Sequence, residues 1–200
     1  MGSGKSTFLK TLTVLLKKLD WSLSSLSSDA LRKELVDKYR EKNPGVEERE
    51  AFDKTAKTAT IEFNRRLEKL VGDADKPSNK PVHVIFVDKN HPPNALDKTI
   101  KSVREKAPQG SKVRCLYMVP RILQKPVPGY PFSASFFMQC FYRIMKRDEH
   151  ETLSNSDPVL AVSVLFMFFK FYFKEGLNST FLADHELDGF MEVPLTVEDV

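Results

Sequence analysis

The chain has 200 residues, of which 41% are hydrophobic, and it carries a formal net charge of +4. These values predict one globular domain, residues 1–200, with a hydrophobic core; repeats and low-complexity tracts are absent, which excludes a solenoid or a fibrous chain. The mild positive charge suits a polyanionic partner but does not require one.

The sequence contains neither a signal peptide nor a membrane-spanning run. Its longest apolar run, 159–169, is shorter than the ~20 residues that cross a bilayer, so we predict a buried helix there. We therefore expect no membrane partner and an intracellular location, cytoplasmic or nuclear. Cys115 and Cys140 fall in a predicted strand and a predicted helix, so we expect buried thiols in a reducing compartment.

The chain opens on half of a phosphate-binding loop. The full pattern is G-x-x-x-x-G-K-[ST], and its second half is matched by Gly2, Ser3, Gly4, Lys5, Ser6 and Thr7. Apolar residues at 3–4 spacing over 8–19 predict the helix that follows such a loop. The glycines let backbone N–H groups surround phosphate oxygens, and the helix directs its positive end at the same anion. Lys5 is expected to bridge the β- and γ-phosphates, and the Ser6 hydroxyl to ligate Mg²⁺.

The first half of this loop does not occur in the chain. Its first glycine, and the strand that delivers it, would lie upstream of Met1. We therefore expect a fragment of a larger protein whose first strand is missing. The alternative is a glycine- and serine-containing N-terminus in front of an ordinary amphipathic helix.

A short strand is predicted over 21–26, followed by a helix from near Asp29 to about Tyr39. Ligands of α/β sheets bind outside the carboxyl ends of strands, so Asp29 is expected to accept the proton of an attacking hydroxyl. Arg32, about one turn later, is expected to hold a substrate phosphate on the same helix face. The alternative is that Asp29 serves only as the N-cap of this helix.

A long helix comes next. Asn43 and Pro44 predict its start, and apolar residues at 3–4 spacing extend it to about Leu70. Arg65 and Arg66 on this helix are expected to be surface charges or, alternatively, part of a nucleic-acid track.

A polar loop over 72–81 leads to a buried strand over 82–87, which ends at Asp88. A carboxylate in this position orients the waters of a bound Mg²⁺ in nucleotide-binding proteins, so Asp88 is a candidate metal residue. The alternative is a polar turn that ends the strand. His91 receives no separate role.

Predicted helices and strands continue to alternate in the rest of the chain. A helix over 94–106, a strand over 113–119 and a proline-rich loop over 120–131 precede a helix over 132–150. The apolar helix follows, and 182–200 shows no clear pattern. Arg143 and Arg147 share one face of helix 132–150, where they would neutralise charge in phosphoryl transfer, unless both are simply solvated. The alternation of strands and helices predicts a parallel α/β sheet.

Together these segments resemble the polynucleotide kinase domain of plant and fungal tRNA ligases, a P-loop family related to other 5′-hydroxyl polynucleotide kinases. The resemblance extends over roughly residues 1–175. Its segments, in chain order, are Gly4-Lys5-Ser6-Thr7, Ser28-Asp29-x-x-Arg32, Asp88-Lys89-Asn90-His91-Pro92, Tyr130-Pro131-Phe132-Ser133 and Cys140-x-x-Arg143-x-x-x-Arg147-x-x-His150.

The resemblance implies a nucleotide-kinase-like parallel sheet flanked by helices, with the missing first strand at its centre. It implies that Asp29 is the general base on an RNA 5′-hydroxyl and that Arg32 contacts the substrate phosphate. Lys5 and Ser6 would handle ATP or GTP and Mg²⁺, and Arg143 and Arg147 would belong to a lid or nucleobase-contacting helix. The substrate would be RNA with a 5′-OH end, such as a tRNA exon. The family's ligase and phosphodiesterase modules would lie elsewhere in the protein or act in trans.

Two other functions fit the same residues. One is a P-loop kinase for a small metabolite, which would need no RNA. The other is a truncated, inactive domain that binds nucleotide or RNA without turnover.

Overall fold

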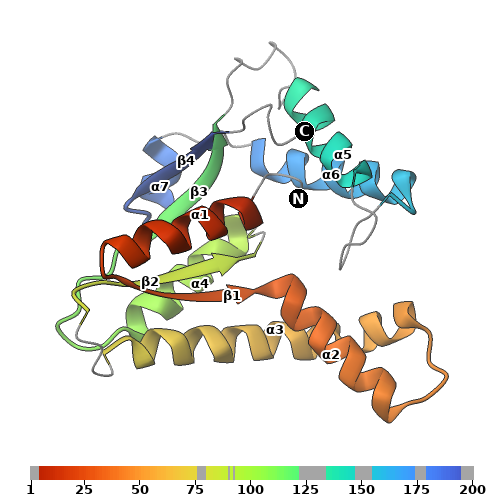
Figure 1. Ribbon diagram of the computed structural model, residues 1–200, viewed down its shortest axis with the longest axis horizontal. Helices are drawn as coiled ribbons and strands as arrows, with labels where there is room; N and C mark the ends of the chain where they lie inside the picture. Colours follow the sequence, from red (N-terminus) through yellow and green to blue (C-terminus); the bar gives the residue numbers. More distant parts are fainter. Residues whose placement is uncertain are drawn as a thin grey trace. The chain divides into compact units, whose positions relative to one another are not determined.

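A computed structural model of the chain describes residues 5–75, 80–89, 91, 93–121, 134–146, 155–173 and 179–194. Figure 1 shows helices and short strands alternating along the chain, which confirms the predicted α/β class. The elements are α1 (Lys5–Lys18), β1 (Ser22–Ser27), α2 (Ser28–Lys42), α3 (Glu48–Gly72), a 3₁₀ turn (Asp73–Asp75), β2 (His83–Asp88), α4 (Pro93–Lys106), β3 (Leu116–Arg121), α5 (Ala134–Met145), α6 (Pro158–Phe173), α7 (Ser179–Asp184) and β4 (Gly189–Pro194).

The strands form two separate parallel pairs. Among the described residues β1 pairs with β2, and β3 pairs with β4. The sequence predicted one parallel sheet, and the parallel pairing is confirmed. Two separate strand pairs do not establish a P-loop fold, so membership of that fold stays a prediction.

Contacts divide the chain into two compact units. The first comprises Thr11–Asn90 and Lys101–Ser111, and therefore contains β1, α2, α3 and β2. The second contains β3, β4, α5, α6 and α7, together with the first residues of α1 and of α4.

The core of the first unit lies between α3 and the β1–β2 pair. Every fourth residue of α3 is buried from Ala51 to Val71, as expected for one face of a helix. The part of this face from Phe63 to Val71 packs with Leu26 of β1, with Leu31 of α2 and with the partly buried Ile85 and Val87 of β2. In Figure 1, α3 runs along the strand pair with α2 beside it.

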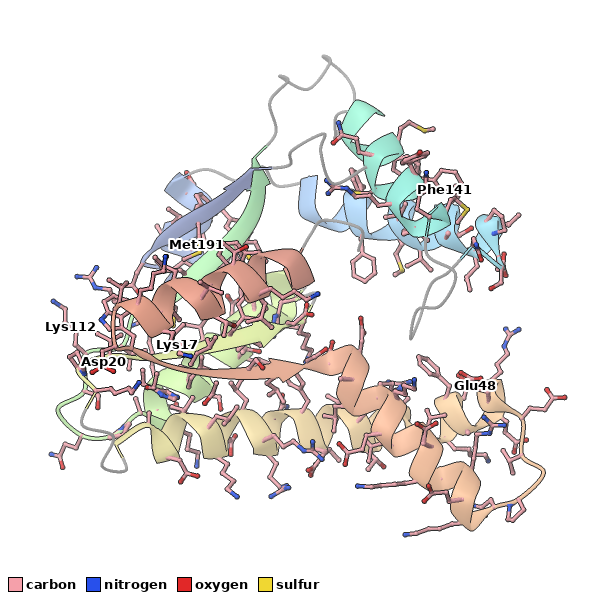
Figure 2. All side chains as sticks on the ribbon, in the orientation of Figure 1. Lys17, Asp20, Glu48, Lys112, Phe141 and Met191 are labelled. Carbon is pink, nitrogen blue, oxygen red and sulfur yellow. The ribbon has the colours of Figure 1, made fainter. Side chains whose placement is uncertain are left out.

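The predicted start of the long helix is wrong. Asn43 ends α2 as its C-cap: its backbone N–H bonds to the carbonyls of Tyr39 and Arg40, and its side-chain Nδ2 donates to the Tyr39 carbonyl at 2.8 Å. A turn with Gly45 at a φ of +93° follows, and α3 begins only at Glu48, which Figure 2 labels. Asn before Pro is common at both ends of helices, and here it ends one.

Ion pairs join α2 to α3. Arg66 donates to both carboxylate oxygens of Glu34, at 2.9 and 3.0 Å, and also to Glu62 at 2.8 Å. Arg65 bonds Glu62 through two nitrogens, both at 2.7 Å. The two arginines suggested as a nucleic-acid track are therefore surface charges engaged with carboxylates of their own unit.

We expect the ion pairs of Arg66 to stabilise the first unit only above acidic pH. Hydrogen bonds from Arg66 and Lys38 lower the pKa of Glu34 from 4.5 to about 2, and those from Arg65 and Arg66 lower the pKa of Glu62 to about 2. A carboxyl whose pKa is lower in the folded state contributes stability that is present above its unfolded pKa. That contribution is lost as the pH falls from 4.5 towards 2.

Thermal melts of the wild type and of Arg66→Gln across this pH range measure the effect. At neutral pH the wild type should melt at a higher temperature than Arg66→Gln. The difference in melting temperature should disappear as the pH approaches about 2. Arg40→Gln, at an exposed position of α2, is the control. A difference that stays constant with pH would show that the ion pairs contribute nothing.

The core of the second unit contains the β3–β4 pair. Leu96 and Ile100 of α4 and Phe181 of α7 are buried together, with Tyr117 and Phe190 of the two strands packed against them. The predicted strand over 113–119 lies at Leu116–Arg121, and β4 was not predicted. Cys115 lies just before β3 and is only partly buried, contrary to expectation; Cys140 is buried, and neither cysteine forms a disulfide.

Helices α5 and α6 pack as a pair in the second unit. Cys140 and Ile144 of α5 are buried against Ala161, Leu165 and Phe169 of α6, and Figure 2 labels Phe141, which packs against this cluster. The prediction that the apolar helix is buried is only half right, because other apolar side chains of α6 are exposed, including Val159 at 77% and Phe166 at 55%. Within the parts of the chain that the structure describes, no helix is both long and apolar enough to cross a bilayer.

Candidate functional site

The predicted carboxylates meet at the carboxyl end of the β1–β2 pair. Ser27, the last residue of β1, is in register with Asp88, the last residue of β2. Paired strands lie only ~5 Å apart, so Asp88 is a close neighbour of the chain segment that opens α2. Asp29 lies in that segment, as the second residue of α2. The fold of the first unit therefore brings the two acids to one edge.

The N-cap of α2 is Ser27 and not Asp29. The Ser27 hydroxyl accepts a hydrogen bond from the backbone N–H of Ala30 at 3.3 Å, and its backbone is extended. The alternative reading of Asp29 as a capping residue is therefore wrong. Within the described residues, the partly buried Asp29 carboxylate forms no hydrogen bond or ion pair. It remains available to a ligand at the positive end of α2.

Arg32 lies one turn further along α2 and is held by α3. Its guanidinium carbon is 3.9 Å from the centre of the Phe52 ring, and its Nη2 donates to the Phe52 carbonyl at 3.0 Å. Burial lowers the pKa of Arg32 from its usual value, and the charge of Asp53 opposes that shift. The nitrogen Nε is buried and has no hydrogen-bond partner among the described residues. An anion that bonds to Nε would supply the missing partner.

Lys89 is a site residue that belongs to the Asp88-Lys89-Asn90-His91-Pro92 segment but received no role from the sequence. It follows Asp88 directly, and its ammonium nitrogen lies 4.3 Å from the centre of the Phe63 ring of α3. Desolvation by burial lowers the pKa of Lys89 below its usual value. Its place beside Asp88 was visible in the sequence, but its contact with an aromatic ring follows from the packing of β2 on α3.

The other predicted residues lie outside this group. Lys5, Ser6 and Thr7 begin α1, as expected for a helix that follows a phosphate loop, and Gly2, Ser3 and Gly4 precede the described residues. Arg143 is buried in α5, in the second unit, and Arg147 lies outside the described residues. The structure thus groups Asp29, Arg32, Asp88 and Lys89 in the first unit.

Asp88 has the chemistry that a magnesium ion requires. Mg²⁺ prefers oxygen ligands, keeps several waters and is usually held by one or two carboxylates together with substrate phosphates. A search of the described residues finds no cluster of three or more His, Cys, Asp or Glu side chains that would hold a metal ion. A magnesium ion bound by one carboxylate and by phosphates does not need such a cluster. The donor at the edge of β2 therefore fits the expected cofactor.

Comparison with known proteins identifies no relative: no family model, no curated protein and no solved structure matches the chain.

Proposed function

We propose that this chain is a 5′-hydroxyl RNA kinase domain resembling that of plant and fungal tRNA ligases. It transfers the γ-phosphate of ATP or GTP to the 5′-OH end of an RNA. The observation that carries the proposal is the Asp29 carboxylate, which has no capping role and lies two residues past Ser27, the strand partner of Asp88 at the carboxyl end of two parallel strands. Ligands of α/β sheets bind at this edge.

Each of the site residues has a separate role in the phosphoryl transfer. The 5′-oxygen of the RNA forms a bond to the γ-phosphorus, and Asp29 accepts the proton that this hydroxyl loses. The bond between the γ-phosphorus and the bridging β–γ oxygen breaks, which releases the nucleoside diphosphate. Lys5 and the backbone of the Gly2–Thr7 loop bind the phosphates of the nucleotide. Arg32 binds a phosphate of the RNA, and Arg143 and Arg147 belong to a lid or to a helix that contacts the nucleobase. Ser6 and Asp88 would hold Mg²⁺, which would neutralise phosphate charge.

The kinase reaction is tested with γ-labelled ATP and, separately, GTP. An oligoribonucleotide with a 5′-OH end should become labelled in the presence of Mg²⁺, whereas the same oligonucleotide with a 5′-phosphate should not. Turnover of small alcohols without RNA, unaffected by competing oligonucleotide, would identify a metabolite kinase instead. The Lys5→Met variant is the negative control, because it lacks the charge that binds the β- and γ-phosphates.

One observation favours a second candidate, a domain that binds nucleotide or RNA without turnover. The described strands form two separate pairs, whereas a kinase sheet of the expected type is continuous. A cooperative melt that nucleotide shifts upward, with no labelled RNA, would support this candidate; binding at a hundred times Kd stabilises a protein by about 2.7 kcal/mol.

A further inference from the structure

We propose that Lys89 binds a backbone phosphate of the RNA, as a second anchor distinct from Arg32. This inference rests on the proposed function and names how the substrate strand is held.

Lys89 differs from the ion-paired cations of α2 and α3 in the partner that holds it. Lys38, Arg65 and Arg66 each form an ion pair with Glu34 or Glu62. Among the described residues Lys89 has no such carboxylate, and its ammonium group lies over the Phe63 ring. A structural ion pair therefore does not account for this charge.

The surroundings of Lys89 suit an anion. The side chain is partly buried at the carboxyl end of β2, where substrates of α/β sheets bind. The aromatic ring fixes the ammonium by a cation–π contact but supplies no hydrogen-bond acceptor to its three donors. A phosphate oxygen supplies that acceptor and a compensating charge in a place with little water, where such a bond is strong.

The positions of the two rings indicate a strand of several nucleotides. Phe52, under Arg32, and Phe63, under Lys89, are eleven residues apart in α3, which is close to three full turns. They therefore lie on nearly the same face, separated along the helix by roughly 16 Å. One phosphate group cannot reach both cations, whereas different phosphates of an RNA strand that crosses the carboxyl end of the β1–β2 pair can contact them.

The test measures binding of a single-stranded 5′-OH oligoribonucleotide to the full chain without nucleotide, by fluorescence anisotropy at several salt concentrations. Lys89→Met keeps the aliphatic stem over the ring and removes the charge. We expect affinity to fall about tenfold, as for the loss of one charge-assisted hydrogen bond. The slope of log K against log salt should fall by about 0.7, the value for one phosphate contact on a single strand.

Three comparisons separate this role from a structural one. Lys89→Arg should restore affinity and salt slope, since it keeps the charge. Lys57→Met, at an exposed position of the same helix α3, should change neither. The thermal shift given by Mg²⁺ and ATP should be equal in the wild type and Lys89→Met; a loss of that shift, with RNA binding intact, would place Lys89 on the triphosphate and overturn the proposal.

The outcomes for Lys89 and for the kinase reaction are distinct. Unchanged RNA affinity and salt slope in Lys89→Met, or no RNA binding by the wild type, would refute the role of Lys89 even if RNA ends become labelled. Binding that depends on Lys89 without any labelling would support this role and refute the kinase reaction.

Discussion

Replacing Asp29 with Asn should lower kcat for RNA phosphorylation by about 10²- to 10⁴-fold, the usual contribution of a general base. The substitution separates the two roles considered for this residue. Asn and Asp are equally good N-caps, so a residue that only capped α2 would tolerate the change. The amide cannot accept the proton of the 5′-hydroxyl, so a general base would not.

The assay compares kcat of the wild type, Asp29→Asn and Asp37→Asn at saturating RNA and nucleotide. Asp37 lies on α2 eight residues beyond Asp29 and is exposed, so its variant makes the same chemical change away from the site. It should retain full activity. Ser27→Ala, which removes the observed cap, should cost ~1 kcal/mol of stability and leave most of kcat. Full activity in Asp29→Asn would remove the general-base assignment and would leave the rest of the site in question.

Replacing Phe63 with Ala should lower the free energy of unfolding by about 3–5 kcal/mol, the usual cost of deleting a buried aromatic ring. The Phe63 side chain is 2% exposed and packs among Leu26, Leu31 and Leu67, where β1, α2 and α3 meet. Its loss removes apolar contacts from all three elements and leaves a cavity, and it also removes the ring beneath Lys89.

Urea denaturation measures this effect, with Ile61→Ala as the matched control. Ile61 is on the same helix, two residues away, and is 61% exposed, so its truncation should cost less than ~0.5 kcal/mol. Equal losses for the two variants would contradict the assignment of Phe63 to the core of the first unit.

Local sequence patterns predicted the helices and strands in which apolar residues recur at a regular spacing or form an unbroken run. The 3–4 spacing of apolar residues predicted α3 along most of its length, and the apolar run before Asp88 predicted β2 to within one residue. Asn43 misled the prediction, since an Asn before Pro can end one helix or start another, and only the hydrogen bonds to Tyr39 and Arg40 decide. Strand β4 is short, begins with Gly189 and ends with Pro194, and it pairs with a strand about 70 residues earlier in the chain.

The sequence by itself determined which residues carry charge at the carboxyl ends of the strands: Asp29 and Arg32 after the first, Asp88 and Lys89 at the second. Local chemistry and strand periodicity are enough for that, because both act between residues close in the chain. The structure alone showed what these side chains contact. Ser27 and not Asp29 is the N-cap of α2, so the Asp29 carboxylate has no capping role. Phe52 and Phe63 of α3 lie beneath the charged groups of Arg32 and Lys89. The two ring contacts depend on the packing of α3 against α2 and β2, which no local pattern encodes.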